Sequence, residues 1–343
     1  MSHSVLKKGT VMTLLSIVIP LLNEEKNLIP LYEELSAVIT KLTHFTTIEF
    51  IFVNDGSMDN SLAILKVLAT GDARVKIISF IRNFGHENAT YAGIHHASGN
   101  GVVLIDADRQ DPAELIIKFE QHYLEGYDIA YGQRTKRLNE TWIKKTTSRL
   151  FYPLFKKLTH IDMPANTGDF CLLSRRAIEV FKMLPENQVF VRGLIYWSGL
   201  PKIAVPFVRR SRASGQSKYN YTKLTIFALE NIVSFSTVPM YILIFGSLVV
   251  ITACLLGGSI AVVMKLFGCV VMTGWTSLML ALLFLFACTF FALGIIGIYI
   301  GKIFQELKRR PMFVVQELIG LAPNNVQQNA GYTYLKMDRN EDA

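Results

Sequence analysis

Between residues 14 and about 132, short apolar runs alternate with segments of helical periodicity. Leu28, Leu31 and Leu35 recur at the spacing of one helix face, whereas Val102–Ile105 is an uninterrupted apolar run typical of a buried strand. This alternation predicts a mostly parallel sheet covered by helices on both faces. The predicted strands are Leu14–Pro20, Ile48–Val53, Val75–Ile81, Val102–Ile105 and Asp128–Tyr131, and the predicted helices are Glu24–Leu42, Leu62–Leu68, Glu87–Ala97 and Pro112–Leu124.

Two later stretches, residues 232–264 and 266–301, contain no charged side chain. A helix needs roughly 20 apolar residues to cross the hydrocarbon core of a bilayer, so each stretch is long enough for one crossing. We expect two transmembrane helices, near 237–263 and 276–300. The alternative is two buried core helices, although uncharged runs of this length are rare in soluble folds.

Basic residues gather beside these two stretches. Six lysines and arginines and no acid lie within residues 201–225, and Lys302, Lys308, Arg309 and Arg310 follow the second stretch. The positive-inside rule therefore predicts that both termini are cytoplasmic and that a short loop lies outside. The net charge of +8 is explained better by anionic lipid headgroups than by nucleic acid, because the basic residues are juxtamembrane.

The N-terminus and the cysteines agree with a cytoplasmic catalytic part. The first residues lack a small-residue cleavage site and lead directly into a predicted strand, so we expect no signal peptide. The four cysteines form no CxxC pair, which argues against a disulfide framework or a zinc site. The seven histidines form no metal-ligand pattern, and we expect His95 and His96 to be structural.

Acidic and amide side chains follow three predicted strands at the point where each strand ends. Asn23 and Glu24 follow the first strand, Asp55 the second, and Asp106 and Asp108 the fourth. Ligands of such folds bind beyond the carboxyl ends of the strands, so we expect these side chains to converge. Because clustered carboxylates repel one another, they favour a hard divalent cation, Mg²⁺ or Mn²⁺, that also binds substrate phosphates.

The chain contains neither a GxxxxGK[ST] phosphate loop nor a GxGxxG motif. A P-loop ATPase or a dinucleotide dehydrogenase would therefore lack its main binding device. What remains is a nucleotide diphosphate held through a metal on the Asp106-x-Asp108 pair. Such pairs are common in loops, but this one follows an apolar strand and lies beside two other polar strand ends.

Eight stretches of the chain resemble the family 2 glycosyltransferases of the GT-A fold. They are SIVIPLLNEEKNL, FIFVNDGSMDNS, RNFGHENATYAGIHHASGN, LIDADRQDP, YGQR, NTGDFCLLSRRA, FVRG and RASGQSKY. With the two C-terminal helices, their order is similar to that of polyprenyl-phosphate glycosyltransferases, a group that includes bactoprenol glucosyltransferases and dolichol-phosphate mannose synthase. The resemblance implies a GT-A domain over 1–210, a basic loop and juxtamembrane helix over 211–232, two transmembrane helices over 233–303 and a cytoplasmic tail over 304–343.

The resemblance also implies roles for individual residues. Asp169 matches the family's catalytic aspartate, and Arg109 stands where similar enzymes have an apolar residue. The implied nucleotide-binding residues are Pro20, Asn23, Glu24, Asp55 and Asp106; the implied metal ligands are Asp106, Asp108 and Gln110; and the acceptor phosphate is expected at Arg134, Arg212, Ser217 and Lys218, with Arg134, Arg212 and Lys218 also assisting catalysis.

The implied reaction moves a sugar, with UDP-glucose as first expectation, to undecaprenyl phosphate with inversion. A phosphate acceptor is mostly dianionic at neutral pH, since its second pKa is about 6, and so needs little help from a general base. Asp169 is then expected to orient the sugar or to stabilise positive charge, unless it is simply an acid before a predicted Leu172–Phe181 helix. Arg209 and Arg210 are expected to anchor the domain at the membrane surface.

Several alternatives remain open at this point. The donor sugar can instead be mannose, GlcNAc, galactose or aminoarabinose. A processive polysaccharide synthase would carry a Gln-x-x-Arg-Trp motif, which is missing here. A non-catalytic membrane sensor of nucleotide sugars is the alternative from another class. The resemblance further implies a homotetramer in the bacterial inner membrane.

Overall fold

In the computed structural model, the chain divides into two compact units, one made of residues 1–153, 161–218 and 309–343 and the other of residues 154–160 and 219–308. Each unit is described by itself. The described residues are 13–136, 164, 167–183, 191–210, 238–267, 274–308, 310–321 and 332–334.

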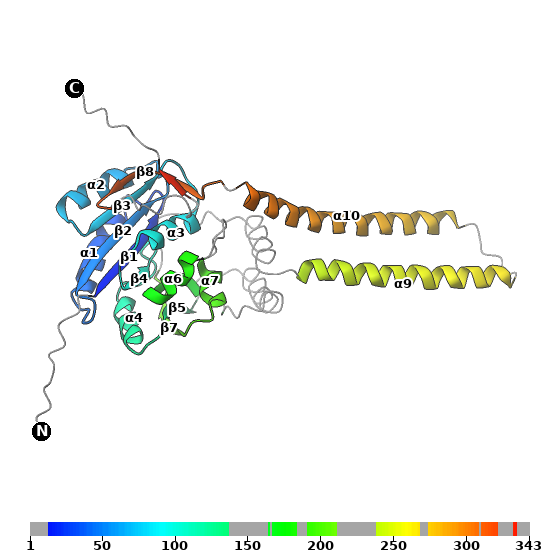
Figure 1. Cartoon of the computed structure of the whole chain (residues 1–343), viewed down its shortest axis with the longest axis horizontal. Coiled ribbons are helices and arrows are strands. Elements are labelled where there is room, and N and C mark those ends of the chain that lie inside the picture. Colours follow the sequence, from blue (N-terminus) through cyan, green and yellow to red (C-terminus); the bar gives the residue numbers. More distant parts are fainter. Residues whose placement is uncertain are drawn as a thin grey trace, which may run out of the picture. The chain divides into compact units, whose positions relative to one another are not determined.

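The first unit is built on a nine-stranded mixed sheet in the order β7-β5-β6-β4-β1-β2-β3-β8-β9, counted over the described residues (Figure 1). Strands β4, β1, β2 and β3 are parallel neighbours, while β6 runs antiparallel between β4 and β5. The strands are β1 (Leu14–Leu21), β2 (Thr47–Asn54), β3 (Val75–Phe80), β4 (Gly101–Leu104), β5 (Ile129–Lys136), β6 (Thr167–Ser174), β7 (Lys202–Val208), β8 (Phe313–Ile319) and β9 (Tyr332–Tyr334).

Helices cover both faces of this sheet because successive strand residues point to opposite sides. Ile17 and Ile19 of β1 belong to the core cluster that contains Leu28 of α1, whereas Val18 faces α3. Gly93 permits this second contact, since a Cβ there would lie 2.1 Å from a Val18 methyl carbon. The helices are α1 (Leu28–Ile39), α2 (Ser61–Gly71), α3 (His86–His96), α4 (Leu115–Leu124), α6 (Arg175–Met183) and α7 (Val191–Trp197).

The expected mostly parallel sheet with helices on both faces is confirmed, whereas the predicted helix at Leu172–Phe181 is correct from Arg175 onward and wrong before it. Its first residues belong to β6, and α6 begins only at Arg175. The run Phe170–Leu173 is buried on both faces of the sheet, because helices α4, α6 and α7 pack against β6. A strand buried on both faces loses the period-2 signal and cannot be distinguished from a buried helix by periodicity.

The segment that follows the second long helix returns to the sheet as β8. Phe313 stacks on Phe80 of β3 with ring centroids 4.7 Å apart, and Lys66 pairs with Glu317 at 2.7 Å. Strand β8 is antiparallel to β3 and extends the sheet beyond it. Part of the predicted 304–343 tail is therefore a strand of the first unit, a role that no sequence pattern predicted.

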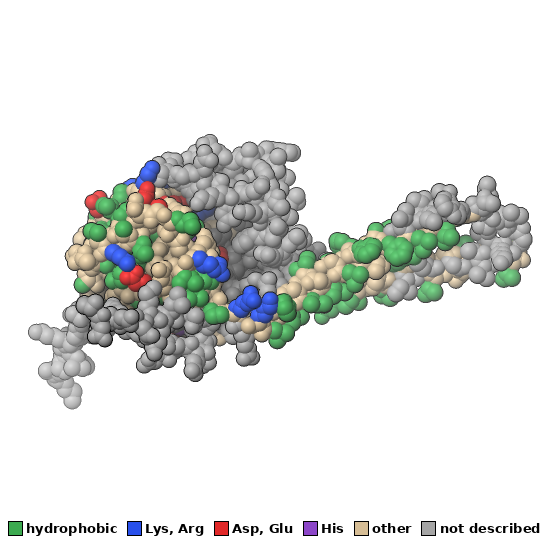
Figure 2. Space-filling view, turned by 90° about the horizontal axis from the view of Figure 1, so that it is seen from above, with side chains coloured by type: hydrophobic (Ala, Val, Ile, Leu, Met, Phe, Trp, Pro, Cys, Tyr) green, Lys and Arg blue, Asp and Glu red, His purple; other side chains and the backbone are tan. Residues whose placement is uncertain are grey.

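The second unit contains two long helices in contact with each other, α9 (Val238–Leu266) and α10 (Trp275–Leu307). Large apolar side chains lie exposed on both helices; Phe245 is 65% exposed and Phe290 is 70% exposed. In Figure 2, hydrophobic side chains, in green, line the visible face of the long helical part. Within the described residues, Phe284–Gly301 is the one stretch both long and apolar enough to cross a membrane, and Leu243–Gly257 is a shorter apolar stretch. Both predicted spans are helical. Two membrane crossings are not confirmed, because within the described residues only Phe284–Gly301 has the length and hydropathy of a crossing.

We expect the catalytic unit to lose stability below neutral pH because of His95. Its side chain lies buried in α3, where burial, with the charge of Lys182 and the neighbouring His96 adding to it, lowers the pKa of His95 to about 4. A depressed histidine pKa stabilises the fold above the unfolded value of about 6.5, and this contribution is lost as the pH falls towards 4. From pH 7 to pH 5 the loss is about 2 kcal/mol.

This expectation is measured as the thermal unfolding midpoint of the detergent-solubilised chain at pH 7 and pH 5. His95→Phe should reduce the difference between the two midpoints, while His122→Phe, at the end of α4, should leave it unchanged. An equal pH dependence in the unaltered chain and in His95→Phe would contradict the assignment.

Candidate active site

Side-chain hydrogen bonds tie together the loops that follow β1, β2 and β3. Asn23, which adopts a left-handed backbone with φ 57°, accepts the Met58 N–H at 2.8 Å, and its own N–H donates to Ser57 Oγ at 2.9 Å. Asp55 accepts the N–H groups of Phe84 at 2.7 Å and Gly85 at 3.0 Å. Hydrogen bonds thus join the three loops to one another at the carboxyl edge of the sheet.

The residues expected to bind the nucleotide lie along this surface. Pro20 is buried in β1 opposite Val53 of β2, and Glu24 Oε2 accepts the Asn27 side-chain amide at 2.6 Å. Burial raises the pKa of the Asp55 carboxyl, although its two backbone N–H donors oppose the rise. Asp55 therefore fixes the loop after β3, and its nucleotide role remains a prediction.

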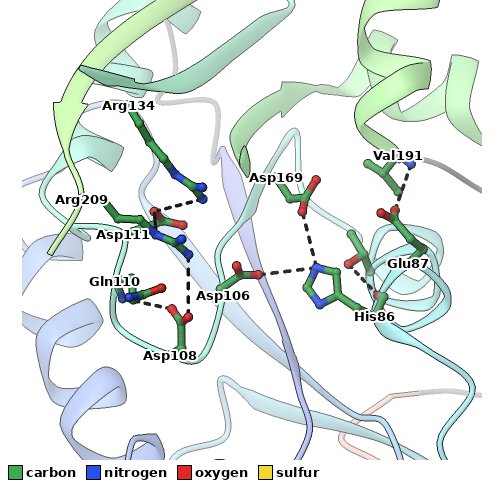
Figure 3. A network of polar contacts seen from close by, with 11 residues as sticks. His86, Glu87, Asp106, Asp108, Gln110, Asp111, Arg134, Asp169, Val191 and Arg209 are labelled. Carbon is green, nitrogen blue, oxygen red and sulfur yellow. Dashed lines mark hydrogen bonds and ion pairs between the residues drawn. The ribbon is translucent and has the colours of Figure 1, made fainter. Parts of the chain in front are cut away.

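Antiparallel pairing of β6 with β4 places Asp169 opposite Asp106. Leu104 pairs with Cys171, and continuing that register by two residues brings the two aspartates together. His86, at the start of α3, lies between them, with its Nε2 3.6 Å from an oxygen of Asp106 and 3.6 Å from an oxygen of Asp169 (Figure 3). The imidazole is 42% exposed, so this group of side chains remains open to solvent on one side.

The charge of His86 is set by these two carboxylates. Burial lowers the pKa of the imidazole, but contact with Asp169 and the negative charge of Asp106 outweigh burial and raise the pKa to about 10. The sequence analysis missed this residue, because a histidine that follows a glycine carries no recognisable ligand spacing. Its role depends on the register of β6, which the sequence did not reveal.

Two arginines face a second pair of carboxylates in the same site (Figure 3). Arg209, after β7, lies 3.8 Å from Asp108 and 3.8 Å from Asp111, while Arg134 of β5 lies 4.0 Å from Asp111. Burial chiefly, with the charge of Asp106 adding to it, raises the pKa of Asp111 to about 7 against the pull of the two arginines. Asp111 is almost fully buried and is the least exposed carboxylate of this charged cluster.

Arg209 and Arg210 both contact carboxylates of the first unit. Arg209 faces the site carboxylates, and Arg210 pairs with Glu34 at 2.6 Å and Glu114 at 2.9 Å. The membrane-anchoring role expected of these two arginines stays a prediction, which these contacts do not test.

The Asp-x-Asp turn has a defined conformation. The Gln110 N–H donates to Asp108 Oδ1 at 3.1 Å, and the Gln110 carbonyl accepts the Arg210 N–H at 3.0 Å. Arg109 has a left-handed φ of 57° and its guanidinium lies 3.5 Å from Glu34. Arg109 is thus directed to Glu34 of α1.

The described residues do not by themselves enclose a metal ion, since no three His, Cys, Asp or Glu side chains among them form a ligand cluster. The donor set nonetheless fits a hard divalent cation that takes its other ligands from phosphate and water. Burial, together with the charges of Asp169 and Asp108, raises the pKa of Asp106. A cation beside Asp106 and Asp108 would relieve that repulsion. Arg212, Ser217 and Lys218 lie outside the described residues.

Comparison with known proteins identifies the family. Residues 16–181 match Glycosyl transferase family 2. The chain is 42% identical to an uncharacterised glycosyltransferase of Synechocystis sp., across 90% of this chain and 96% of the relative. The chain belongs to glycosyl transferase family 2. This family 2 glycosyltransferase is also 36% identical to the SfII prophage-derived bactoprenol glucosyl transferase of Shigella flexneri, across 88% of this chain and 97% of the relative.

Solved structures of similar fold are more distant. The glucosyl-3-phosphoglycerate synthase of Mycobacterium tuberculosis, crystallised with Mn²⁺, UDP and glucosyl-3-phosphoglycerate, aligns with a TM-score of 0.46 and 18% identity over 64% of this chain and 78% of that one. Staphylococcus aureus TarS, crystallised with UDP-GlcNAc, aligns with a TM-score of 0.43 and 14% identity over 65% of this chain and 66% of that one.

Gly168 makes room for Arg134, because a Cβ at position 168 would lie 2.7 Å from the guanidinium. We expect Gly168→Ala to displace this flexible group by a few tenths of an ångström and to reduce sugar transfer by about three- to tenfold. The thermal unfolding midpoint should stay unchanged. The measurement is transfer of labelled sugar from nucleotide-sugar donors in membranes that contain the enzyme.

Gly132→Ala is the matched comparison. Its Cβ would meet the buried Phe207 ring at 2.8 Å, so it should lower the unfolding midpoint. Full transfer activity in Gly168→Ala would show that the position of the Arg134 guanidinium does not matter to the reaction.

Proposed function

We propose that this glycosyltransferase moves glucose from UDP-glucose to undecaprenyl phosphate, with inversion at the sugar and with Mg²⁺ or Mn²⁺ as cofactor. The observation that carries the proposal is the convergence of Asp106, Asp108 and Asp169 with two arginines at the carboxyl edge of the sheet. The relatives named bactoprenol glucosyl transferases, which match nearly their whole length at 34–36% identity, support the choice of donor and acceptor.

Asp106, Asp108 and Gln110 are the residues that would hold the cation. When bound, a divalent ion supplies positive charge against the diphosphate leaving group. Arg134 and Arg209 add positive charge beside these carboxylates, where it can stabilise phosphate oxygens. With Arg212, Ser217 and Lys218, Arg134 is proposed to bind the phosphate of the acceptor.

Asp169 acts in this proposal as an orienting and electrostatic group. The acceptor phosphate is mostly dianionic at neutral pH, so no proton has to be removed before attack. His86 Nε2 lies 3.6 Å from a carboxylate oxygen of Asp169 and helps to hold this side chain in the site. An ionised Asp169 stabilises positive charge that develops on the sugar as the bond to the diphosphate breaks.

Helices α9 and α10 are proposed to cross the bacterial inner membrane, with the catalytic unit and both termini in the cytoplasm. Their exposed apolar side chains and the basic residues of the 211–232 loop suit the acyl core and the headgroups respectively. A homotetramer is part of the proposal. Gly257, Gly294 and Gly297 have no neighbouring atom within 4 Å, which leaves small-residue surfaces for packing between chains.

The test incubates purified enzyme with undecaprenyl phosphate, a divalent cation and each of several radiolabelled UDP- and GDP-sugars, followed by organic extraction. Label should enter the lipid phase from UDP-glucose and disappear with EDTA. Asp108→Asn should reduce transfer by more than about 100-fold, since it removes a charged metal ligand, while Glu125→Gln, an exposed change in the same unit, should not. Label from a different donor would correct the sugar; unchanged transfer by Asp108→Asn would remove the metal assignment.

The same assay separates donor from acceptor contacts. We expect Arg212→Ala to raise the KM for undecaprenyl phosphate by about tenfold or more while leaving the affinity for UDP within twofold, because a cation paired with the acceptor phosphate is lost. A selective loss of UDP affinity would move Arg212 to the donor side of the site.

A further inference from the structure

Arg209 makes two long contacts in a site where short ones would be expected. Its guanidinium lies 3.8 Å from Asp108 and 3.8 Å from Asp111, beyond hydrogen-bonding distance. Within the part of the chain that the structure describes, neither Arg209 Nε nor Asp111 Oδ1 has a hydrogen-bond partner. A permanent arginine–carboxylate pair closes to about 2.8 Å, often with two parallel bonds. Arg209 is therefore held near the two carboxylates by electrostatic attraction and not by close hydrogen bonds.

The backbone around Arg209 is fixed, in contrast to its side chain. The next residue, Arg210, donates its N–H to the Gln110 carbonyl at 3.0 Å, which joins this segment to the Asp-x-Asp turn. The Arg210 side chain is held by Glu34 at 2.6 Å and Glu114 at 2.9 Å. Position 209 is thus anchored beside Asp108, while its side chain is 29% exposed and its Nε makes no hydrogen bond within the described residues.

Asp108 is the point where two cations compete. It is the carboxylate that Arg209 faces, and it is also a ligand of the proposed divalent ion. An arginine within a few ångströms of a divalent cation repels it strongly in a partly buried site. Asp108 cannot bind both the guanidinium and the divalent cation tightly at the same time. The phosphate oxygens of a nucleotide offer the arginine another partner.

We propose that Arg209 is an exchangeable counter-ion for the metal site. It neutralises Asp108 and Asp111 when no nucleotide is bound, and yields Asp108 to the divalent cation when the metal and the donor diphosphate arrive together. Arg209 then turns to the diphosphate. This inference rests on the proposed function, and it assigns to a residue outside the family resemblance a part in ordering the binding of metal and donor.

The exchange requires that the affinity for the metal depends on whether nucleotide is bound. Without nucleotide, the cation has to displace Arg209 from Asp108 and leave it with Asp111 alone, so the metal binds weakly. With nucleotide, the phosphates receive the displaced arginine, so the metal binds tightly. Metal and nucleotide are then positively coupled through Arg209, and by linkage each raises the affinity of the other by the same factor.

The experiment measures Mn²⁺ affinity of the purified, detergent-solubilised full chain from the electron paramagnetic resonance signal of free Mn²⁺, with and without UDP. Arg209→Gln and Arg209→Met remove the competing charge, so both should bind Mn²⁺ alone about tenfold more tightly than the unaltered chain. UDP should then strengthen Mn²⁺ binding less than it does in the unaltered chain. Arg209→Lys keeps the charge and should resemble the unaltered chain.

Arg210→Gln is the matched control, since it removes the same charge one residue away and should leave both Mn²⁺ affinities within about twofold. Equal Mn²⁺ affinity in the unaltered chain, Arg209→Gln and Arg209→Met would overturn the exchange and leave the metal site intact. A gain in Arg210→Gln as large as in Arg209→Gln would also overturn it, because general charge would then be the cause. If the unaltered chain binds no Mn²⁺ even with UDP, the proposed metal cofactor fails as well.

Discussion

Mutual repulsion among buried carboxylates is the constraint on which this site depends. Asp106, Asp108 and Asp111 lie in the segment after β4, and Asp169 lies near the start of β6, so two segments bring the four carboxylates together. Ionised carboxylates at such range raise one another's pKa and would drive the loops apart if nothing opposed them. A histidine and two arginines supply that opposition, and each comes from a different element. The fold holds together a charge arrangement that can accept a metal and a diphosphate.

The order of the strands makes this arrangement possible. Parallel β1, β2 and β4 deliver their loops to one edge, as expected for an open α/β sheet. The antiparallel strand β6 runs the other way beside β4, so its beginning, not its end, lies at that edge. Asp169 near the start of β6 therefore faces Asp106. One reversed strand brings in the carboxylate that a purely parallel sheet would have placed at the opposite edge.

The apolar pattern predicted β1 to β5 and α1 to α4 within a few residues, because each of these segments has clear boundaries and a distinct period. It failed at β6, whose buried run reads equally well as a helix. The gathering of Asp106 and Asp108 followed from strand topology, whereas His86 and Arg209 depended on long-range register that no local pattern encodes. Family resemblance supplied Asp169 and Arg134, and it gave no indication of Arg209.

The place of β8 in the chain has a consequence for biosynthesis. The ribosome synthesises β1 to β7 first, then helices α9 and α10, and only afterwards β8, the strand that pairs with β3. Until that strand emerges, β3 is an open sheet edge, and Phe80 lacks the ring that stacks on it. The catalytic unit thus completes its fold after both helices have been synthesised. A chain that terminates between α10 and β8 would leave the edge of β3 unpaired and prone to aggregation.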